Sequence, residues 1–301
     1  MSKFSFLSKR ARSITFALLA SSSLLAGTAY AKTKDTVSIA YGQWASTIAS
    51  ANVVQVALEE AGYKVKLLSL APAAVWQGVA SGDVDVSLGG WLPTTHADYY
   101  ERLGDKIDDL GVNLDGTQLG FVVPAYSKIN SIDELNDYAK ELDGRIYGIE
   151  PGSGLQQKSE DAVKAYGIKL RLLDGSDATM VAELAYAIDN HKEIVVTGWS
   201  PHWKFTRWDL KYLDDPKNVF GDVEQIHTLA RKGLKEDMPD AHTILSNFNW
   251  TPEQMGEVML MNEVPDAKPY ETAKKWLADN PDVLASWLAG IKQPIGVNKD
   301  D

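Results

Sequence analysis

Three tryptophans follow runs of apolar residues that read as strands, and their chemistry is the most informative in the chain. Trp44 comes soon after TVSIAY, Trp91 after VDVSL and Trp199 after EIVVTG. Ligands of open α/β sheets bind beyond the carboxyl ends of the strands, so we expect these three indole rings to meet at one rim. Ring faces carry a negative quadrupole potential that attracts diffuse cations. The pattern predicts a box for a methylated onium ion, which has no N–H group that would lose a hydrogen bond on leaving water.

A fourth strand-like run ends in a glycine turn. RIYGIE leads into PGSGL (151–155), which opens a predicted helix. Backbone N–H groups at a helix start attract anions, by about 0.3 to 1 kcal/mol when exposed and by up to about 2 kcal/mol when partly buried. We expect the N–H groups of Gly154 and Leu155 to hold a carboxylate, although a plain tight turn without a ligand has the same sequence. Phosphate is the competing anion, but no P-loop lysine follows.

His96 lies five residues after Trp91, and two roles are open to it. It could donate a hydrogen bond to the same carboxylate, or it could be a helix-start histidine bonded to the backbone. The chain contains no cysteine, which rules out disulfide and thiol chemistry. We expect neither a metal nor a cofactor, because the remaining histidines lack the paired spacing of a metal site; these are His191, His202, His227 and His242.

The elements that must position these residues alternate between strand and helix, and the alternation runs twice, before and after about residue 121. Such alternation is typical of parallel, doubly wound sheets. We expect segments 119–124 and 224–230 to cross between two lobes. The expected strands are 36–41, 64–70, 84–88, 145–150, 169–173 and 193–198. The expected helices are 46–61, 75–80 and 154–166. A further helix is expected from its cap at Ser176 to about residue 190, and most of the chain after 238 is expected to be helical.

Two further patterns concern helix starts and the core. Ser131–Glu134 and the pair Thr251 and Gln254 have the spacing of capping boxes, which predicts a helix after each. Three other tryptophans have helical spacing among apolar residues and are expected in the core; they are Trp76, Trp276 and Trp287.

Residues 1–31 have the pattern of a secretory signal peptide. Four basic residues open the segment, residues 14–26 are apolar but too few to span a bilayer comfortably, and Ala29-Tyr30-Ala31 offers a cleavage site. We therefore expect a soluble, exported monomer in a bacterial periplasm. The formal net charge is −11, and removing the basic leader makes the chain more acidic still. Such a chain repels phosphate backbones, so we expect no nucleic-acid partner.

At this point the sequence resembles the substrate-binding proteins of bacterial glycine betaine ABC importers, the OpuAC-like, quaternary-ammonium-binding family. The stretches ASGDVDVSLGGWLPTTHADYY, LGFVVPAY, GIEPGSGLQQ, VVTGWSPHW and LKYLDDPKNVFG carry the resemblance, which runs from about residue 36 to 291. WLPTTH and WSPHW together are specific to the family, whereas GSGL is not. The resemblance implies that the protein binds a ligand, delivers it to a membrane permease and catalyses no reaction.

The resemblance also implies a site and a ligand preference. Its three-tryptophan cage corresponds to Trp44, Trp91 and Trp199, and its carboxylate partners correspond to His96 and the N–H groups of Gly154 and Leu155. Choline-binding relatives place an acidic residue close after the first cage tryptophan, whereas here Ala45, Ser46 and Thr47 follow. This difference favours glycine betaine over choline, while choline, carnitine, proline betaine and the sulfonium dimethylsulfoniopropionate all stay open.

The fold implied by the resemblance is the two-lobed periplasmic binding protein fold of type II. Each lobe is a mostly parallel sheet flanked by helices, and the ligand cleft lies between the lobes. We expect residues 32–121 and 228–301 to form the first lobe and residues 122–227 the second. The alternative from another class is a secreted hydrolase that uses Ser153 or Ser200 with His96 or His202, but no GxSxG elbow is present.

Overall fold

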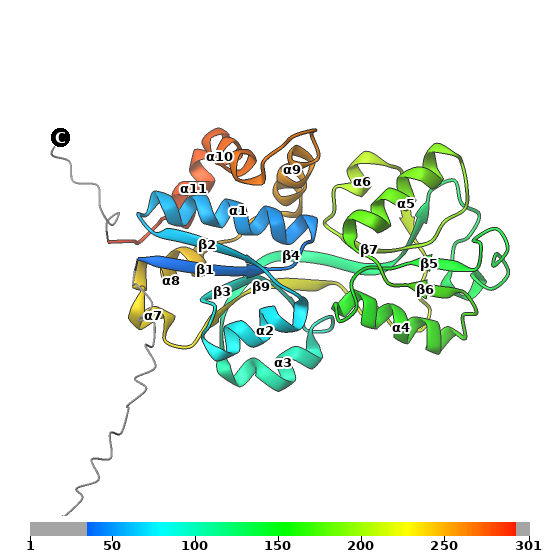
Figure 1. Cartoon of the computed structure of the whole chain (residues 1–301), viewed down its shortest axis with the longest axis horizontal. Coiled ribbons are helices and arrows are strands. Elements are labelled where there is room, and N and C mark those ends of the chain that lie inside the picture. The colour runs from blue at the N-terminus through cyan, green and yellow to red at the C-terminus, as the bar shows by residue number, and fades with distance from the viewer. Residues whose placement is uncertain (1–34, 293–301) are drawn as a thin grey trace, which may run out of the picture. The chain divides into compact units, whose positions relative to one another are not determined.

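The computed structural model describes residues 35–292, so the expected signal peptide (1–31) lies outside the described residues. Within that range, nine strands form one continuous path of hydrogen-bonded neighbours in the order β2-β1-β3-β9-β4-β7-β5-β6, with β8 paired to β4 (Figure 1). The path falls into two halves, which we call the first lobe, built on β1 to β3, and the second lobe, built on β5 to β8. No helix of the described part has both the length and the apolar composition to cross a bilayer.

The first lobe is a parallel sheet with helices on both faces. Strands β1 (Thr36–Tyr41), β2 (Lys64–Ser69) and β3 (Val86–Leu92) pair in parallel. Central β1 is buried along its middle residues, as expected for a strand covered on both sides. The helices of this lobe are α1 (Ala45–Glu60), α2 (Pro72–Ser81) and α3 (Ala97–Leu103), followed by the 3-10 turn η1 (Gly104–Lys106).

The second lobe repeats this arrangement with shorter strands. Strands β5 (Arg145–Tyr147), β6 (Arg171–Leu173) and β7 (Val196–Ser200) are parallel, and β8 (Leu210–Tyr212) pairs with β4. Ser176 caps α5 through its side chain, as expected. The helical elements are η2 (Ile132–Glu134), α4 (Gly154–Tyr166), α5 (Asp177–Asp189) and α6 (Lys204–Arg207).

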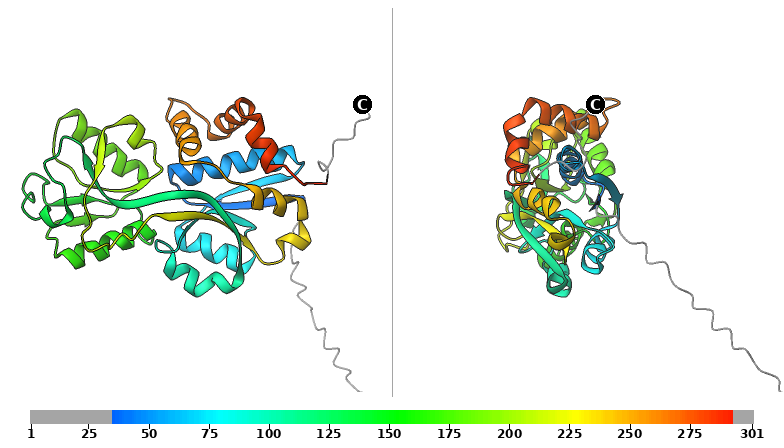
Figure 2. Two further views of the ribbon diagram at one scale, coloured as in Figure 1. Left: turned by 180° about the vertical axis from the view of Figure 1, so that it is seen from behind. Right: turned by 90° about the vertical axis from the view of Figure 1, so that its left-hand side faces the viewer.

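Two antiparallel strands join the lobes. β4 (Ile107–Pro124) pairs with β9 (Glu224–Arg231) in the first lobe and with β7 in the second, and the two strands run alongside each other in both views of Figure 2. The β4–β9 ladder shifts register at three places, near Gly111 and Gly116, whose positive φ angles of 109° and 84° suit bulges. The expected crossings fall in β4 and β9, and the lobe boundaries near 121 and 227 stay a prediction.

Three of the C-terminal helices, α8, α9 and α10, contact α1, and Figure 1 shows α9 and α10 beside it. Proline occupies the first turn of four of the C-terminal helices, where its missing N–H costs nothing, and the capping box of Thr251 and Gln254 is confirmed. The three tryptophans expected in the core are buried, and Trp276 and Trp287 pack with Phe248 and Trp250. The five helices are α7 (Leu234–Asp237), α8 (Pro239–Asn247), α9 (Pro252–Asn262), α10 (Pro269–Asp279) and α11 (Pro281–Trp287).

Two of the expectations about local structure that were wrong concern β3 and the turn after Ser131. The strand expected at 84–88 is shifted along the chain, because Gly90 packs tightly against β9: a Cβ there would lie 2.6 Å from Leu229 Cδ1. Trp91 therefore lies in the strand rather than beyond it. At Ser131 only a 3-10 turn forms, because the Glu134 carboxylate accepts the Asn130 N–H at 2.8 Å and leaves the capping box open.

Candidate functional site

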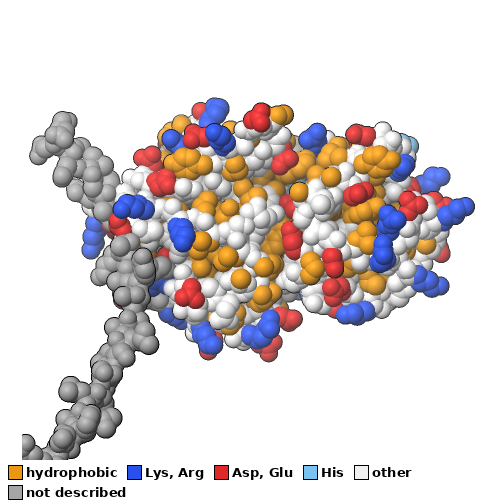
Figure 3. All heavy atoms as spheres, in the orientation of Figure 1, with side chains coloured by type: hydrophobic (Ala, Val, Ile, Leu, Met, Phe, Trp, Pro, Cys, Tyr) orange, Lys and Arg blue, Asp and Glu red, His pale blue; other side chains and the backbone are white. Residues whose placement is uncertain are grey.

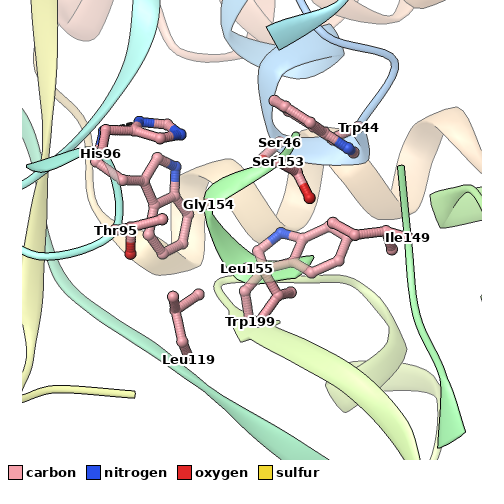
Figure 4. A pocket seen from close by; sticks show the side chains of 11 residues that line it. Trp44, Ser46, Thr95, His96, Leu119, Ile149, Ser153, Gly154, Leu155 and Trp199 are labelled. Atoms are coloured by element: carbon pink, nitrogen blue, oxygen red, sulfur yellow. Dashed lines mark hydrogen bonds between the residues drawn. The ribbon is translucent and has the colours of Figure 1, made fainter. Parts of the chain in front are cut away.

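One cavity lies between the lobes, and the six residues singled out in the sequence all line it (Figure 4). About 380 Å³ of space, part of it open to solvent, is free of protein atoms here, and the wall is mainly apolar. Such a concave, largely apolar space with a few polar groups is the usual form of a small-molecule site. Its lining residues are Trp44, Ser46, Trp91, Thr95, His96, Leu119, Ile149, Ser153, Gly154, Leu155 and Trp199.

Trp44 enters the cavity from the N-cap position of α1. Gly42 makes room for its ring, since a Cβ on Gly42 would lie 2.6 Å from Trp44 Cζ3. The indole Nε1 donates to Oε2 of Glu150 at 2.8 Å, and Glu150 belongs to the second lobe. A neighbouring bond crosses the cleft in the same way: the Ala45 N–H donates to Oδ2 of Asp177 at 3.0 Å. The first indole is therefore oriented by the opposite lobe.

Trp91 and His96 are held together by a loop that a buried carboxylate organises. Glu224 accepts the N–H groups of Thr94 and Thr95, the latter at 2.7 Å, and also the Thr95 hydroxyl. His96 Nδ1 accepts the Trp91 N–H at 2.9 Å. The backbone bond considered for His96 is thus present. The ring also lines the cavity, and its bond to a ligand carboxylate stays a prediction.

The protonation of His96 follows from these contacts. Burial lowers the pKa of His96 to about 4, so the ring is neutral at physiological pH. Since Nδ1 accepts a hydrogen bond, the single proton lies on Nε2. Nε2 has no protein partner in the described part of the chain and is the donor available to the cavity.

Trp199 reaches the cavity from β7 and is 4% exposed. Gly198 lets β7 pack closely on β4, because a Cβ there would overlap Val122. The His202 and Trp199 rings form a T-shaped pair, with centroids 4.6 Å apart and planes at 87°. As with Trp91, the strand expected to end before this tryptophan instead contains it, and it begins only at Val196.

The glycine turn forms the polar end of the cavity. Ser153 caps α4 by accepting the Gln156 N–H at 3.2 Å, and Gly152 has a φ of 83°. The first N–H groups of a helix have no acceptor within the helix, and here they belong to Gly154 and Leu155 at the cavity wall. A Cβ on Gly154 would overlap Thr95 of the first lobe, so glycine permits this close approach.

The serines considered as nucleophiles are engaged elsewhere. Ser153 Oγ donates to the Glu150 carbonyl at 2.8 Å, and Ser200 Oγ pairs with the Tyr212 hydroxyl at 2.8 Å. Within residues 35–292, neither hydroxyl bonds to a histidine, as serine activation requires. The same range holds no group of three histidine or acidic residues placed to bind a metal ion.

Sequence reasoning missed the carboxylates that set this geometry. Glu150, Asp177 and Glu224 are far in sequence from the residues that they bond to. Asp177 and Glu224 also lie outside the stretches that carry the resemblance. It also missed the smaller wall residues Ser46, Leu119 and Ile149, which carry no chemical signature.

Two α/β lobes joined by crossing strands, with a cavity between them, define a substrate-binding protein of the two-lobed class. The model of the OpuAC family, described as the substrate-binding domain of ABC-type glycine betaine transport systems, matches residues 35–279. The chain belongs to this family.

Relatives agree with this assignment. The glycine betaine/carnitine transport binding protein GbuC of Listeria monocytogenes is 46% identical over 168 residues, which are 54% of this chain and 55% of GbuC. The chain thus aligns with about half the length of this curated relative. Lactococcal OpuAC, closed and complexed with glycine betaine, is 42% identical, with a TM-score of 0.80 over 84% of this chain and 99% of that chain. An ABC-transporter choline binding protein in complex with choline is 28% identical, with a TM-score of 0.81 over 87% of this chain and 94% of that chain.

Proposed function

We propose that this protein captures glycine betaine, or a similar methylated onium zwitterion, and delivers it to the permease of an ABC importer. The observation that carries the proposal is the convergence of Trp44, Trp91 and Trp199 on one cavity that also contains a helix start. In the proposed complex the trimethylammonium group lies among the three indoles. The carboxylate accepts from His96 Nε2 and from the first N–H groups of α4.

The energetics are adequate for transport. Each indole face contributes about 0.5 to 2 kcal/mol to cation binding, and each buried methyl adds about 0.8 kcal/mol. A ligand of about eight heavy atoms has a ceiling near −12 kcal/mol. Micromolar affinity needs about −8 kcal/mol, so the site does not need ideal contacts.

Ligand choice rests on the charges around Trp44. The residues that follow it are neutral. Of the nearby carboxylates, Asp177 accepts hydrogen bonds with both oxygens and Glu150 with one, and neither residue lines the cavity. A carboxylate ligand therefore meets no acidic side chain in the cavity wall. Choline is the second candidate, because a choline-binding relative shares the fold at 28% identity.

Closure of the two lobes around the ligand would be the step between ligand capture and delivery to the permease. Contacts across the cleft, such as Tyr99 Oη donating to the Gly152 carbonyl at 3.0 Å, are available only when the lobes meet. A ligand that touches both lobes favours the closed form, which the permease would distinguish from the empty protein. We further propose export to the periplasm through residues 1–31, action as a monomer, and lobes formed by 32–121 with 228–301 and by 122–227.

A thermal-shift panel tests this function. Binding to the native state raises the unfolding midpoint by mass action, so glycine betaine at 1 mM should raise it by several degrees, whereas glycine, which lacks the methyl groups, should not. Choline, carnitine, proline betaine and dimethylsulfoniopropionate rank the alternatives. No shift with any onium compound, checked by calorimetry, would exclude the proposed function.

A further inference from the structure

Lys204, the first residue of α6, has an unusual environment for a lysine. Its side chain is completely buried, and Nζ has no hydrogen-bond partner among the residues that the structure describes. Instead, Nζ lies over aromatic rings, 4.2 Å from the Trp199 centroid and 5.6 Å from that of Phe205. A buried ammonium without acceptors is costly, and the face of the Trp199 ring offsets part of this cost.

The charged groups around Lys204 do not neutralise it directly. Asp177 is nearby but forms no salt bridge with Nζ, because one oxygen bonds to His202 Nε2 at 3.0 Å and the other to the Ala45 N–H. His202 Nδ1 accepts the Lys204 N–H at 3.1 Å, which leaves the proton on Nε2. More remotely, Glu263 after α9 interacts electrostatically with Asp177 and with Arg207 of α6.

The same indole faces the ligand cavity. Trp199 lines the cavity, whereas Lys204 does not. The ammonium and a ligand in the cavity must therefore contact different surfaces of one ring. Each cation is attracted by the ring, but two cations on one indole repel each other through a dry interior, where screening is weak.

We propose that Lys204 is an affinity-determining residue, whose ammonium competes with the onium group for Trp199, so that ligand binding expels the lysine proton. The inference rests on the proposed function, and it concerns how Lys204 controls the affinity of that same site for its ligand. Glycine betaine would bind the form with neutral Lys204 more tightly than the form with charged Lys204.

The direction of the pH dependence follows. Burial lowers the pKa of Lys204 to about 7, with Asp177 partly opposing the shift. The lysine is thus mostly charged at pH 6 and mostly neutral at pH 8.5, and affinity should rise across this window. The pKa values of His96 and His202 are both about 4, so neither histidine titrates there.

Isothermal titration calorimetry of the full protein with glycine betaine tests the proposal. For the wild type, Kd should fall on the order of tenfold from pH 6 to pH 8.5, because deprotonation of Lys204 removes the repulsion between two unit charges on opposite surfaces of one ring. Lys204→Met should bind at pH 6 about as tightly as the wild type binds at pH 8.5, with no slope. Lys192→Met is the matched control, because Lys192 lies over Tyr186 at 4.8 Å on the exposed surface; it should keep the wild-type slope.

A second measurement needs no variant. Titrations of the wild type near pH 7 in two buffers of different ionisation enthalpy should reveal a fraction of a proton released for each betaine bound. Two results would overturn the role of Lys204 and leave the proposed function standing. One is betaine binding without proton release and with a Kd that does not change with pH. The other is an equal pH dependence of Kd in Lys204→Met. Absence of any onium binding would overturn this inference together with the proposed function.

Discussion

Trp44 Nε1 and Glu150 Oε2 lie 2.8 Å apart, so a ring at the start of α1 is fixed by a carboxylate from the opposite lobe. A hydrogen bond to an ionised group contributes about 1.5 to 3 kcal/mol, and here it orients a proposed ligand contact. Glu150→Ala should weaken glycine betaine binding by about 1 to 2 kcal/mol in calorimetry. Glu150→Gln keeps an acceptor oxygen and should lose less. Exposed Glu160→Ala on α4 is the control, and an equal loss there would show a nonspecific effect.

Trp91 is expected to be a major contact for the cation. Trp91→Ala should weaken betaine binding by at least about 1 kcal/mol, the contribution of one desolvated ring face. Trp276→Phe, in the C-terminal core, should lower the unfolding midpoint without changing Kd. Unchanged affinity in Trp91→Ala would remove this ring from the proposed site.

His96 should discriminate between ligands by their carboxylate. His96→Ala removes the Nε2 donor, so betaine should lose far more affinity than choline, which has no carboxylate. The comparison uses competition or calorimetry with both ligands at pH 7.5. Equal losses would mean that His96 only supports the loop through its bond to Trp91.

Gly154 should tolerate no side chain. A Cβ there would overlap Thr95 across the cleft, so Gly154→Ala should hold the lobes apart and reduce betaine affinity at least about tenfold. Gly256→Ala in α9 meets nothing within 4 Å. That control should leave Kd unchanged and raise stability by about 0.5 to 1 kcal/mol. Wild-type affinity in Gly154→Ala would contradict the close approach.

Acid should destabilise the fold through two buried histidines. Burial lowers the pKa of His96 and His202 to about 4, below the value of about 6.5 expected in the unfolded chain. Between these values the unfolded chain binds more protons, so the free energy of unfolding falls as pH falls from 6.5 to 4. Urea unfolding at pH 7, 6, 5 and 4.5 should show this slope, and His96→Gln should reduce it. A slope unaffected by the substitution would assign the effect to other groups.

The sequence was sufficient for features that depend on neighbouring residues. Apolar runs predicted most strands, and α4 was expected at its observed bounds because GSG and Gly167 mark its ends. Because ligands of open α/β sheets bind at the carboxyl ends of the strands, the three tryptophans could be assigned to one site before the orientation of their rings was known. Strand ends were less accurate, since pairing with β9 and β4 extends β3 and places Trp199 inside β7.

Contacts distant in sequence were not predictable in this way. Glu224 bonds to Thr95, and Asp177 to Ala45, across more than a hundred residues. Nothing in the local sequence distinguishes these acids from solvated ones. Lys204 is the sharpest case, because a lysine after an aromatic run reads as a surface residue and is instead fully buried.

The length of β4 has a consequence for dissecting this protein. The single strand β4 forms hydrogen bonds in both lobes. A fragment that contains only one lobe would therefore either cut β4 or keep a part of it without its pairing strand. An excised fragment would expose a long unpaired edge, the usual seed of aggregation. The two halves are therefore expected to melt as one cooperative unit.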